Sequence, residues 1–287
     1  MGQPQLSLIV AVYNKPEALR LVLAGCARQS FADFEVIVAD DGSTDDICAV
    51  IAEAREAYEF PLLHLWHPDE GWRKNVMLNN GIRASRTGYL VFIDGDCIPS
   101  RHFLHDHWVH REHGRVLLGR RVETSELWTN NLTLEEVQNG RFERLRWREI
   151  SDGLAGRSLR VEDGVRIPSK ALRALLLRGI TGMLGSNFSV SKEDLISING
   201  FDEQYDGPGC GEDSDIQFRL SLIGVHGKSM RNLAVQYHLH HPATVVSQKS
   251  LERFGKVKEM REPRCSVGLQ PIELKTPDTG KQQKRRL

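Results

Sequence analysis

The first hundred residues alternate between short apolar runs and longer segments whose apolar residues recur at helical spacing. Four apolar runs have the length of a strand, and the last of them has the composition of a strand buried on both faces. The predicted strands are Leu6–Val12, Phe34–Ala39, Leu62–Leu65 and Tyr89–Ile93. The predicted helices begin after the turn at Pro16 and cover Ile47–Tyr58 and Lys74–Ala84. This alternation predicts an α/β fold with a Rossmann-like, mainly parallel sheet flanked by helices.

Polar residues follow three of these strands directly. Asn14 follows the first strand, Asp41 lies in the acidic loop after the second, and Asp94 and Asp96 follow the fourth. Ligands of open parallel sheets bind at the carboxyl ends of the strands. We therefore expect these four side chains to meet at one rim of the sheet.

Asp94 and Asp96 are separated only by Gly95, so an extended chain would place both carboxylates on one face. Gly95 would allow the backbone to bend close to a ligand. Paired carboxylates suit a hard divalent cation such as Mn²⁺ or Mg²⁺, which leaves other positions for water and phosphate oxygens. The alternative is a strand-to-turn junction capped by aspartates, because Asp favours turns without any ligand.

The middle of the chain has a weaker pattern. A helix at His102–His113 and a strand at Arg115–Gly119 precede residues 126–178, which are rich in Arg and Glu with scattered Leu and Trp. We expect a helical insertion within 120–180. It has two interpretations: a solvated helix face packed on the core, or a basic amphipathic surface near an anionic membrane or an acceptor. The apolar members of that surface are Leu145, Trp147, Ile150, Leu154 and Leu159, and its basic members are Arg141, Arg144, Arg146, Arg148, Arg157 and Arg160.

Glu212 and Asp213 follow a glycine-rich loop and precede an apolar pattern typical of a helix. Both acids are therefore expected at a helix N-terminus, where the helix dipole stabilises a carboxylate. N-capping alone would also account for them.

Three histidines, His238, His240 and His241, follow a predicted strand at Ala234–Tyr237 and are candidate metal donors. The spacing does not choose among them, since His238 and His240 would share a strand face. Stacking or a phosphate contact is the alternative role.

The composition limits the class of protein. The chain has 287 residues, 40% of them hydrophobic, which suits one large domain, and equal numbers of acidic and basic residues give no overall attraction to nucleic acid. The five scattered cysteines indicate reduced thiols, and the first residues lack a basic segment before the apolar run. We expect a cytoplasmic protein, soluble or peripheral on the inner face of the membrane.

In their order and spacing, these motifs resemble the family-2, GT-A-fold glycosyltransferases with a galactosyltransferase-like C-terminal half. The resemblance covers about Leu6 to Pro242 and joins motifs that are weak one by one. They are Ile9–Asn14, Asp40–Asp45, Gly71–Arg73 with Asn79–Ile82, the DXD motif Asp94–Asp96, Gly200–Glu203, Gly211–Asp215 and Tyr237–Pro242.

The resemblance implies a nucleotide-sugar enzyme that inverts the anomeric centre. Residues 1–119 would bind the nucleotide sugar, residues 120–180 would be the insertion, 181–262 would hold the acceptor and catalytic half, and 263–287 would be a loosely attached tail. The implied donor is UDP-linked and the implied acceptor is a glycan or a lipid-linked saccharide, as in polysaccharide biosynthesis by hexosyl- or N-acetylhexosaminyl-transferases.

The implied roles follow the chemistry of such a transfer. Asp41 would accept the uracil imide N–H, and the backbone of Val12, Tyr13 and Asn14 would flank the base. Lys74 or Arg73 would reach the diphosphate, together with Asp94. Asp96, with Asp94 and with His238 or His241, would hold the cation, and Asp213, beside Glu212, would be the general base. For Asp41, an N-cap or Asx turn is the alternative.

Two other functions remain open from the sequence. A sugar nucleotidyltransferase would be expected to carry a glycine-rich basic loop after the first strand, which residues 12–16 lack. A non-catalytic glycan- or nucleotide-binding module could use the same rim, although the acidic residues at 94, 96 and 213 favour an enzyme.

Overall fold

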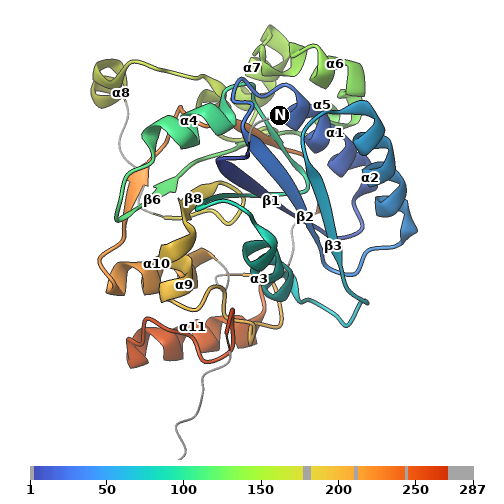
Figure 1. The fold of residues 1–287 in the computed structure, drawn as a ribbon. Helices are drawn as coiled ribbons and strands as arrows, with labels where there is room; N and C mark the ends of the chain where they lie inside the picture. The colour runs from blue at the N-terminus through green and yellow to red at the C-terminus, as the bar shows by residue number, and fades with distance from the viewer. Residues whose placement is uncertain (1–2, 177–181, 210–212, 243–244, 271–287) are drawn as a thin grey trace, which may run out of the picture.

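The computed structural model describes residues 3–176, 182–209, 213–242 and 245–270. Its main sheet has seven strands in the order β3-β2-β1-β4-β8-β6-β9 (Figure 1). Their bounds are β1 Leu6–Val12, β2 Phe34–Asp40, β3 Leu62–Trp66, β4 Tyr89–Asp94, β6 Arg115–Leu118, β8 Phe188–Ser191 and β9 His226–Ser229. Only β8 runs against the other strands of this sheet. The predicted mainly parallel α/β architecture is confirmed.

Helices cover both faces of this sheet. Alternate residues of β1 explain why: Leu8 and Val10 pack in the core under α1 (Pro16–Ala27) and α2 (Asp45–Ala57), whereas Ile9 lies in the core under α3 (Lys74–Ala84). The burial of every β1 residue confirms a strand that is covered on both sides. The second core also receives α9 (Lys192–Ser197) and α10 (Asp213–Leu222).

A small second sheet lies beside the carboxyl end of β4. It has the order β5-β10-β7, with β5 at Cys97–Pro99, β10 at Gln236–His238 and β7 at Val122–Glu123. β10 begins two residues later than the sequence predicts, because Ala234 has a positive φ of 42° that a strand does not accept. β10 also ends one residue later than predicted, because His238 pairs with Cys97 of β5 and Glu123 of β7.

The insertion is helical, as predicted. It contains α5 (Glu126–Asn131), α6 (Leu134–Gln138), α7 (Trp147–Leu154) and α8 (Lys170–Leu176), with 3₁₀ turns at Arg141–Glu143 and Val161–Gly164. Figure 1 shows α6, α7 and α8 along the upper edge of the molecule. The insertion is fixed to α4 (Phe103–His110) by Arg166, which donates two hydrogen bonds to the buried Asp106, at 2.6 and 2.7 Å.

The C-terminal segment differs from the expected loose tail. Residues 263–270, after α11 (Gln248–Met260), pack on the fold, with Cys265 buried and Leu269 against the second core. Asn199 donates to the carbonyl of Cys265 at 2.9 Å. The rest of the predicted tail, residues 271–287, lies outside the described residues.

The cysteines within the described residues, Cys26, Cys48, Cys97 and Cys265, are free, as expected of reduced thiols, and Cys210 lies outside those residues. No helix in the described part of the chain is long and apolar enough to cross a bilayer.

Candidate active site

A pocket of about 520 Å³ opens at the carboxyl ends of β1, β2 and β4, where the sequence predicts the functional rim. Its volume is in the range of pockets that hold small ligands. The predicted residues that line it are Val12, Tyr13, Asp41, Lys74, Asp94, Asp96, Asp213, His238 and His241. Asn14 and Arg73 lie outside the lining, and Glu212 is not among the described residues.

A tight turn connects the two aspartates of the DXD motif. β4 ends at Asp94, and the Gly95 N–H donates to the Ala11 carbonyl at 2.7 Å. A Cβ atom on Gly95 would lie 3.0 Å from the Val12 side chain. The close approach that requires glycine is therefore to β1, and it holds the turn so that Asp96 lies in the pocket.

Three side-chain nitrogen atoms lie close to the Asp96 carboxylate. Its Oδ2 accepts a hydrogen bond from Lys15 Nζ at 2.6 Å, and His238 Nε2 and His241 Nε2 lie 3.6 and 3.4 Å from its carboxylate oxygens. The two histidine Nε2 atoms are 3.1 Å apart. Burial alone would raise the pKa of Asp96, but its contacts with His238, Lys15 and His241 outweigh burial and hold the pKa below its usual range. The carboxylate is therefore ionised.

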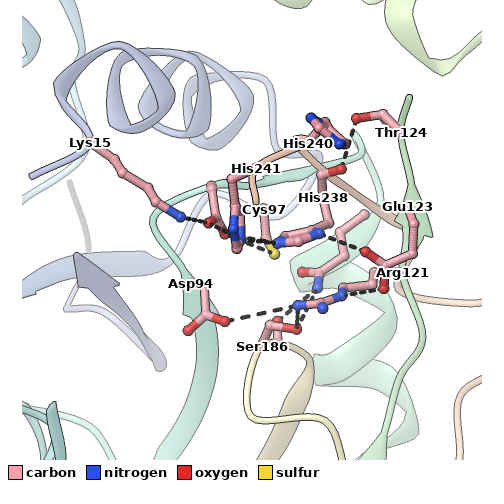
Figure 2. Close-up of polar contacts among 12 residues, drawn as sticks. Lys15, Asp94, Cys97, Arg121, Glu123, Thr124, Ser186, His238, His240 and His241 are labelled. Carbon is pink, nitrogen blue, oxygen red and sulfur yellow. Dashed lines mark hydrogen bonds and ion pairs between the residues drawn. The ribbon is translucent and has the colours of Figure 1, made fainter. Parts of the chain in front are cut away.

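The second sheet orients His238. Its register puts His238 opposite Cys97 on one neighbouring strand and opposite Glu123 on the other. Glu123 Oε2 lies 2.6 Å from His238 Nδ1, and Figure 2 draws this contact as a dashed line. When the Nδ1–H of a neutral His238 donates to this carboxylate, Nε2 carries a lone pair that faces Asp96. Burial opposes the charge of Glu123, but hydrogen bonds and ion pairs with His238 and Arg121 lower its pKa to about 2.

The three histidines do not all face Asp96. The His240 ring points away from His238 and His241 (Figure 2), and the His240 backbone N–H donates to Thr129 Oγ1 at 2.8 Å. Asp96, Cys97 and His238 can each offer a ligand atom within 4.8 Å of one another. Burial raises the pKa of the Cys97 thiol well above its usual range, so it stays protonated. Asp96 and His238 remain from this group, and His241 Nε2 lies 3.4 Å from Asp96 Oδ2, so one carboxylate and two imidazoles are available to a divalent cation.

Positively charged side chains surround the rest of the acidic rim. Lys74 Nζ donates to Asp94 Oδ1 at 2.8 Å, and Arg121 Nη1 lies 4.0 Å from Asp94 Oδ2. The Arg73 guanidinium instead pairs with the exposed Glu70. Of the two residues predicted for the diphosphate, Lys74 is the one whose side chain lines the pocket.

Asp41 lies at the other end of the pocket and is buried. His67 Nε2–H donates to Oδ1 and the Arg73 backbone N–H donates to Oδ2, both at 2.9 Å. Burial is the largest effect on its pKa, which is raised despite these two donors. Asp41 caps neither α2, whose N-cap is Thr44, nor α3, whose N-cap residue Arg73 has no side-chain cap hydrogen bond. Its bond to the Arg73 N–H joins the loop after β2 to the residue before α3.

Asn14 supports the pocket from outside. Its side-chain oxygen accepts from the Thr44 N–H at 3.0 Å, and its own N–H donates to Ser43 Oγ at 2.9 Å. These bonds join the loops after β1 and β2. The neighbouring Tyr13 is half exposed and donates to Asp69 at 2.9 Å, which leaves its ring at the pocket wall.

Asp213 is the first residue of α10 and lines the wall opposite β1. Its Oδ2 accepts from the Gly185 N–H at 3.3 Å, and its Oδ1 accepts from the Ser214 N–H at 2.6 Å. The carboxylate therefore satisfies one donor at the start of its helix, Ser214 N–H, in line with the capping interpretation, and a second donor, Gly185 N–H, from another segment. Asp213 and Asp96 line the same pocket.

A buried ion pair fixes α10 in place. Arg219 and Asp215 are almost fully buried, and Arg219 also donates to the carbonyls of Ile198 and Gly200, each at 2.7 Å. Burying both charges is tolerable because these bonds satisfy the guanidinium. The pair holds the N-terminus of α10, and with it Asp213, at the pocket.

Comparison with known families agrees with this geometry. Residues 7–173 match the family described as "Glycosyl transferase family 2". The chain belongs to this family. Residues 176–242 match the family described as "N-terminal domain of galactosyltransferase", so the glycosyltransferase has the two-part motif order that the sequence predicts.

Curated relatives of this chain include synthases that are much longer than it. Over 260 residues, which make up 83% of this chain and 35% of the relative, the glycosyltransferase is 25% identical to a chondroitin synthase of Escherichia coli. It is 24% identical over 250 residues to a hyaluronan synthase of Pasteurella multocida, covering 83% of this chain and 25% of that protein. The chain thus spans about a third or less of the length of these relatives.

Solved structures with the same fold are GT-A glycosyltransferases. TarS of S. aureus has a TM-score of 0.58 at 15% identity, covering 92% of this chain and 41% of that one. Its 1–349 fragment in complex with UDP has a TM-score of 0.57 at 17% identity, covering 87% and 62%. The mannosyltransferase PcManGT of Pyrobaculum calidifontis, in complex with GDP-Man and Mn²⁺, has a TM-score of 0.54 at 15% identity, covering 92% and 64%.

Three charged residues of the site were not predicted from the sequence: Lys15 and Arg121, which line the pocket, and Glu123, which contacts His238. Lys15 directly follows the motif that closes the first strand, which was a usable signal. Arg121 and Glu123 flank Val122 at the spacing that puts two side chains on one strand face. A strand of two residues gives no visible period, so this signal was too short to use.

Proposed function

We propose that this glycosyltransferase moves a sugar from a UDP-linked donor to a hydroxyl of a glycan or lipid-linked saccharide, with inversion at the anomeric carbon. The observation that carries the proposal is that one pocket is bordered by Asp41, Lys74, Asp96 and Asp213. Such a transfer needs four groups: one that recognises the base, a positive charge for the diphosphate, a ligand for the cation and an acceptor for the proton.

At the nucleotide end, Asp41 accepts the imide N–H of uracil while Val12 and Tyr13 border the base. Each carboxylate oxygen of Asp41 has one donor from the protein and retains acceptor capacity for a ligand. The complex of TarS with UDP, in a protein of the same fold, supports a uridine nucleotide. The relatives named as chondroitin and hyaluronan synthases support a hexosyl or N-acetylhexosaminyl donor.

At the diphosphate, Lys15 and Lys74 supply positive charge. Lys15 lies 2.6 Å from Asp96 and Lys74 lies 2.8 Å from Asp94. Each ammonium group can therefore turn toward a phosphate without crossing the pocket. A divalent cation, when bound by Asp96, His238 and His241 with Asp94, would neutralise the charge of the leaving diphosphate. Nitrogen donors beside the carboxylate favour Mn²⁺ over Mg²⁺.

Asp213 takes the proton. The acceptor oxygen attacks the anomeric carbon as its proton passes to the Asp213 carboxylate, and the bond from that carbon to the diphosphate breaks with both electrons on the leaving oxygen. One in-line displacement converts an α-linked donor to a β-linked product. No side chain of the enzyme needs to form a covalent intermediate.

The test is turnover of a panel of UDP-sugars and GDP-mannose, with EDTA, Mg²⁺ or Mn²⁺, using water and then oligosaccharides as acceptors. We expect metal-dependent release of UDP from at least one UDP-sugar. Binding without turnover of any donor would support a non-catalytic module. Release of pyrophosphate from a nucleoside triphosphate and a sugar phosphate would support a nucleotidyltransferase, and either result would overturn the proposal.

A further inference from the structure

The surface of α7 and the loop after it exposes apolar side chains that nothing in the described chain covers. Trp147, Leu154 and Leu159 are 78%, 80% and 57% exposed, and Ile150 is also exposed. Trp147, Ile150 and Leu154 are spaced by three and four residues, which aligns them on one face of α7. We call these four side chains the α7 face. An apolar face of this kind, open to water, indicates an interaction site.

The acids of the same segment are turned inward. Glu149 and Asp152 are buried, and Asp152 accepts a hydrogen bond from Ser125 at 2.5 Å. Glu143 pairs with Arg28, a residue of the core domain, at 2.5 Å. Residues 141–160 contain three acids in all, and each of them is directed at the protein.

The arginines of the segment are turned outward. All six are exposed, and Arg141, Arg144 and Arg148 make no ion pair with any residue that the structure describes. Arg146 and Arg157 pair with the buried acids but remain more than half exposed. The charged side chains that residues 141–160 expose to solvent are therefore positive, although the whole chain has no net charge.

We propose that the α7 face docks on an anionic lipid bilayer. Trp and Leu side chains on one helix face enter the boundary between headgroups and acyl chains, and arginines around them bind lipid phosphates. A second copy of the chain would fit less well, because two such faces would bring like charges together. The lipid contact goes beyond the sugar transfer and does not depend on it.

The docking face is joined to the active site. Leu159 and Glu123 exchange two backbone hydrogen bonds, at 2.9 and 3.0 Å, and Arg160 lies 3.8 Å from the Glu123 carboxylate. Glu123 in turn contacts His238. A bilayer on the α7 face would therefore lie close to the catalytic pocket, where an acceptor anchored in the membrane would need to enter.

The experiment is co-sedimentation of the full chain with vesicles of phosphatidylcholine alone, or of phosphatidylcholine mixed with phosphatidylglycerol. Two variants remove the proposed contacts: Trp147→Ser with Leu154→Ser, and Arg144→Gln with Arg148→Gln. Matched controls use α11, which lies at the opposite end of the molecule from α7 in Figure 1. They are Met260→Ser, which removes another exposed apolar side chain, and Lys256→Gln with Arg261→Gln.

We expect the wild type to sediment with the anionic vesicles and to be released by high salt. Each arginine near an anionic surface contributes about fivefold, so the arginine pair should weaken binding by about 30-fold, and the serine pair should abolish it. The α11 variants should bind as the wild type does. Hydrolysis of a UDP-sugar in solution should be unchanged in all variants, which shows that the pocket is intact.

Equal binding of the α7 and α11 variants would overturn the proposal, as would a wild type that ignores anionic vesicles at low salt. Self-association lost in Trp147→Ser would assign the face to a second copy instead. Because donor hydrolysis is measured separately, loss of lipid binding with full hydrolysis, or the reverse, distinguishes this proposal from the proposed function.

Discussion

Replacing Glu123 with Gln tests whether the second sheet prepares His238 to bind a cation. Gln has the same size and can still accept the Nδ1–H of His238, so the substitution removes mainly the negative charge behind the ring. Glu123 is a favourable site for this test because its pKa of about 2 keeps it charged at any working pH. A change in cation affinity in this variant can therefore be attributed to the lost negative charge of Glu123.

The magnitude follows from the geometry. With 2.6 Å between Glu123 Oε2 and His238 Nδ1, the carboxylate would lie about 7 Å from a cation on Nε2. At an effective dielectric constant of about 20, a single and a double charge at that separation attract by about 5 kcal/mol. Arg121, 2.9 Å from the same carboxylate, cancels much of this. We expect the net loss to be about 10- to 100-fold in Mn²⁺ affinity, the usual effect of removing such a partner.

The assay is titration of the enzyme with Mn²⁺ in the presence of UDP, followed by electron paramagnetic resonance of the free ion. Glu112→Gln is the matched control, since Glu112 also pairs with a cation, Lys228, but is exposed and does not line the pocket. Its affinity for Mn²⁺ should equal that of the wild type. An unchanged affinity in Glu123→Gln, with an unchanged melting temperature, would refute the role of the second sheet.

Three further outcomes are expected. Asp213→Asn should lower sugar transfer by about 10²- to 10⁴-fold with donor affinity within a few-fold of wild type, whereas a lower melting temperature with full turnover would leave Asp213 only a cap. Asp41→Ala should weaken UDP by at least about tenfold in calorimetry without changing the metal requirement, and equal affinity would remove Asp41 from the site. His107 is neutral and fully buried, and burial lowers its pKa from 6.5 to about 4. The unfolded state therefore binds the extra proton between these values, so stability is complete above pH 6.5 and falls by about 3 kcal/mol as the pH drops toward 4. Urea unfolding should show this slope in wild type and lose it in His107→Gln.

The nucleotide half of the fold was predictable because its strands are apolar on both faces. β1 and α3 have the predicted bounds, since a buried parallel strand and an amphipathic helix each leave a period in the sequence. Asp41 and Asp96 were predictable for a related reason: they directly follow such strands, and the topology brings strand ends together.

The choice among the histidines was not predictable. It depends on a sheet of strands two or three residues long, whose register pairs His238 with Glu123 from a segment 115 residues away. Strands this short, paired over such a distance in the sequence, leave no alternation of apolar and polar residues by which to recognise them. The sequence also did not predict whether the apolar face of α7 packs on the core or faces solvent, because an amphipathic pattern fits both arrangements. Leu145 does pack on the core, whereas Trp147 does not.

Turnover of a UDP-sugar by wild type and Asp96→Ala, each with Mn²⁺ and with EDTA, tests the central claim most directly. Asp96 contributes no apolar packing, but its buried carboxylate pairs with Lys15, His238 and His241, so the melting temperature is measured beside turnover to show that Asp96→Ala is folded at the assay temperature. The account predicts Mn²⁺-dependent release of UDP by the wild type and none by a folded Asp96→Ala. Full Mn²⁺-dependent turnover in Asp96→Ala would contradict it.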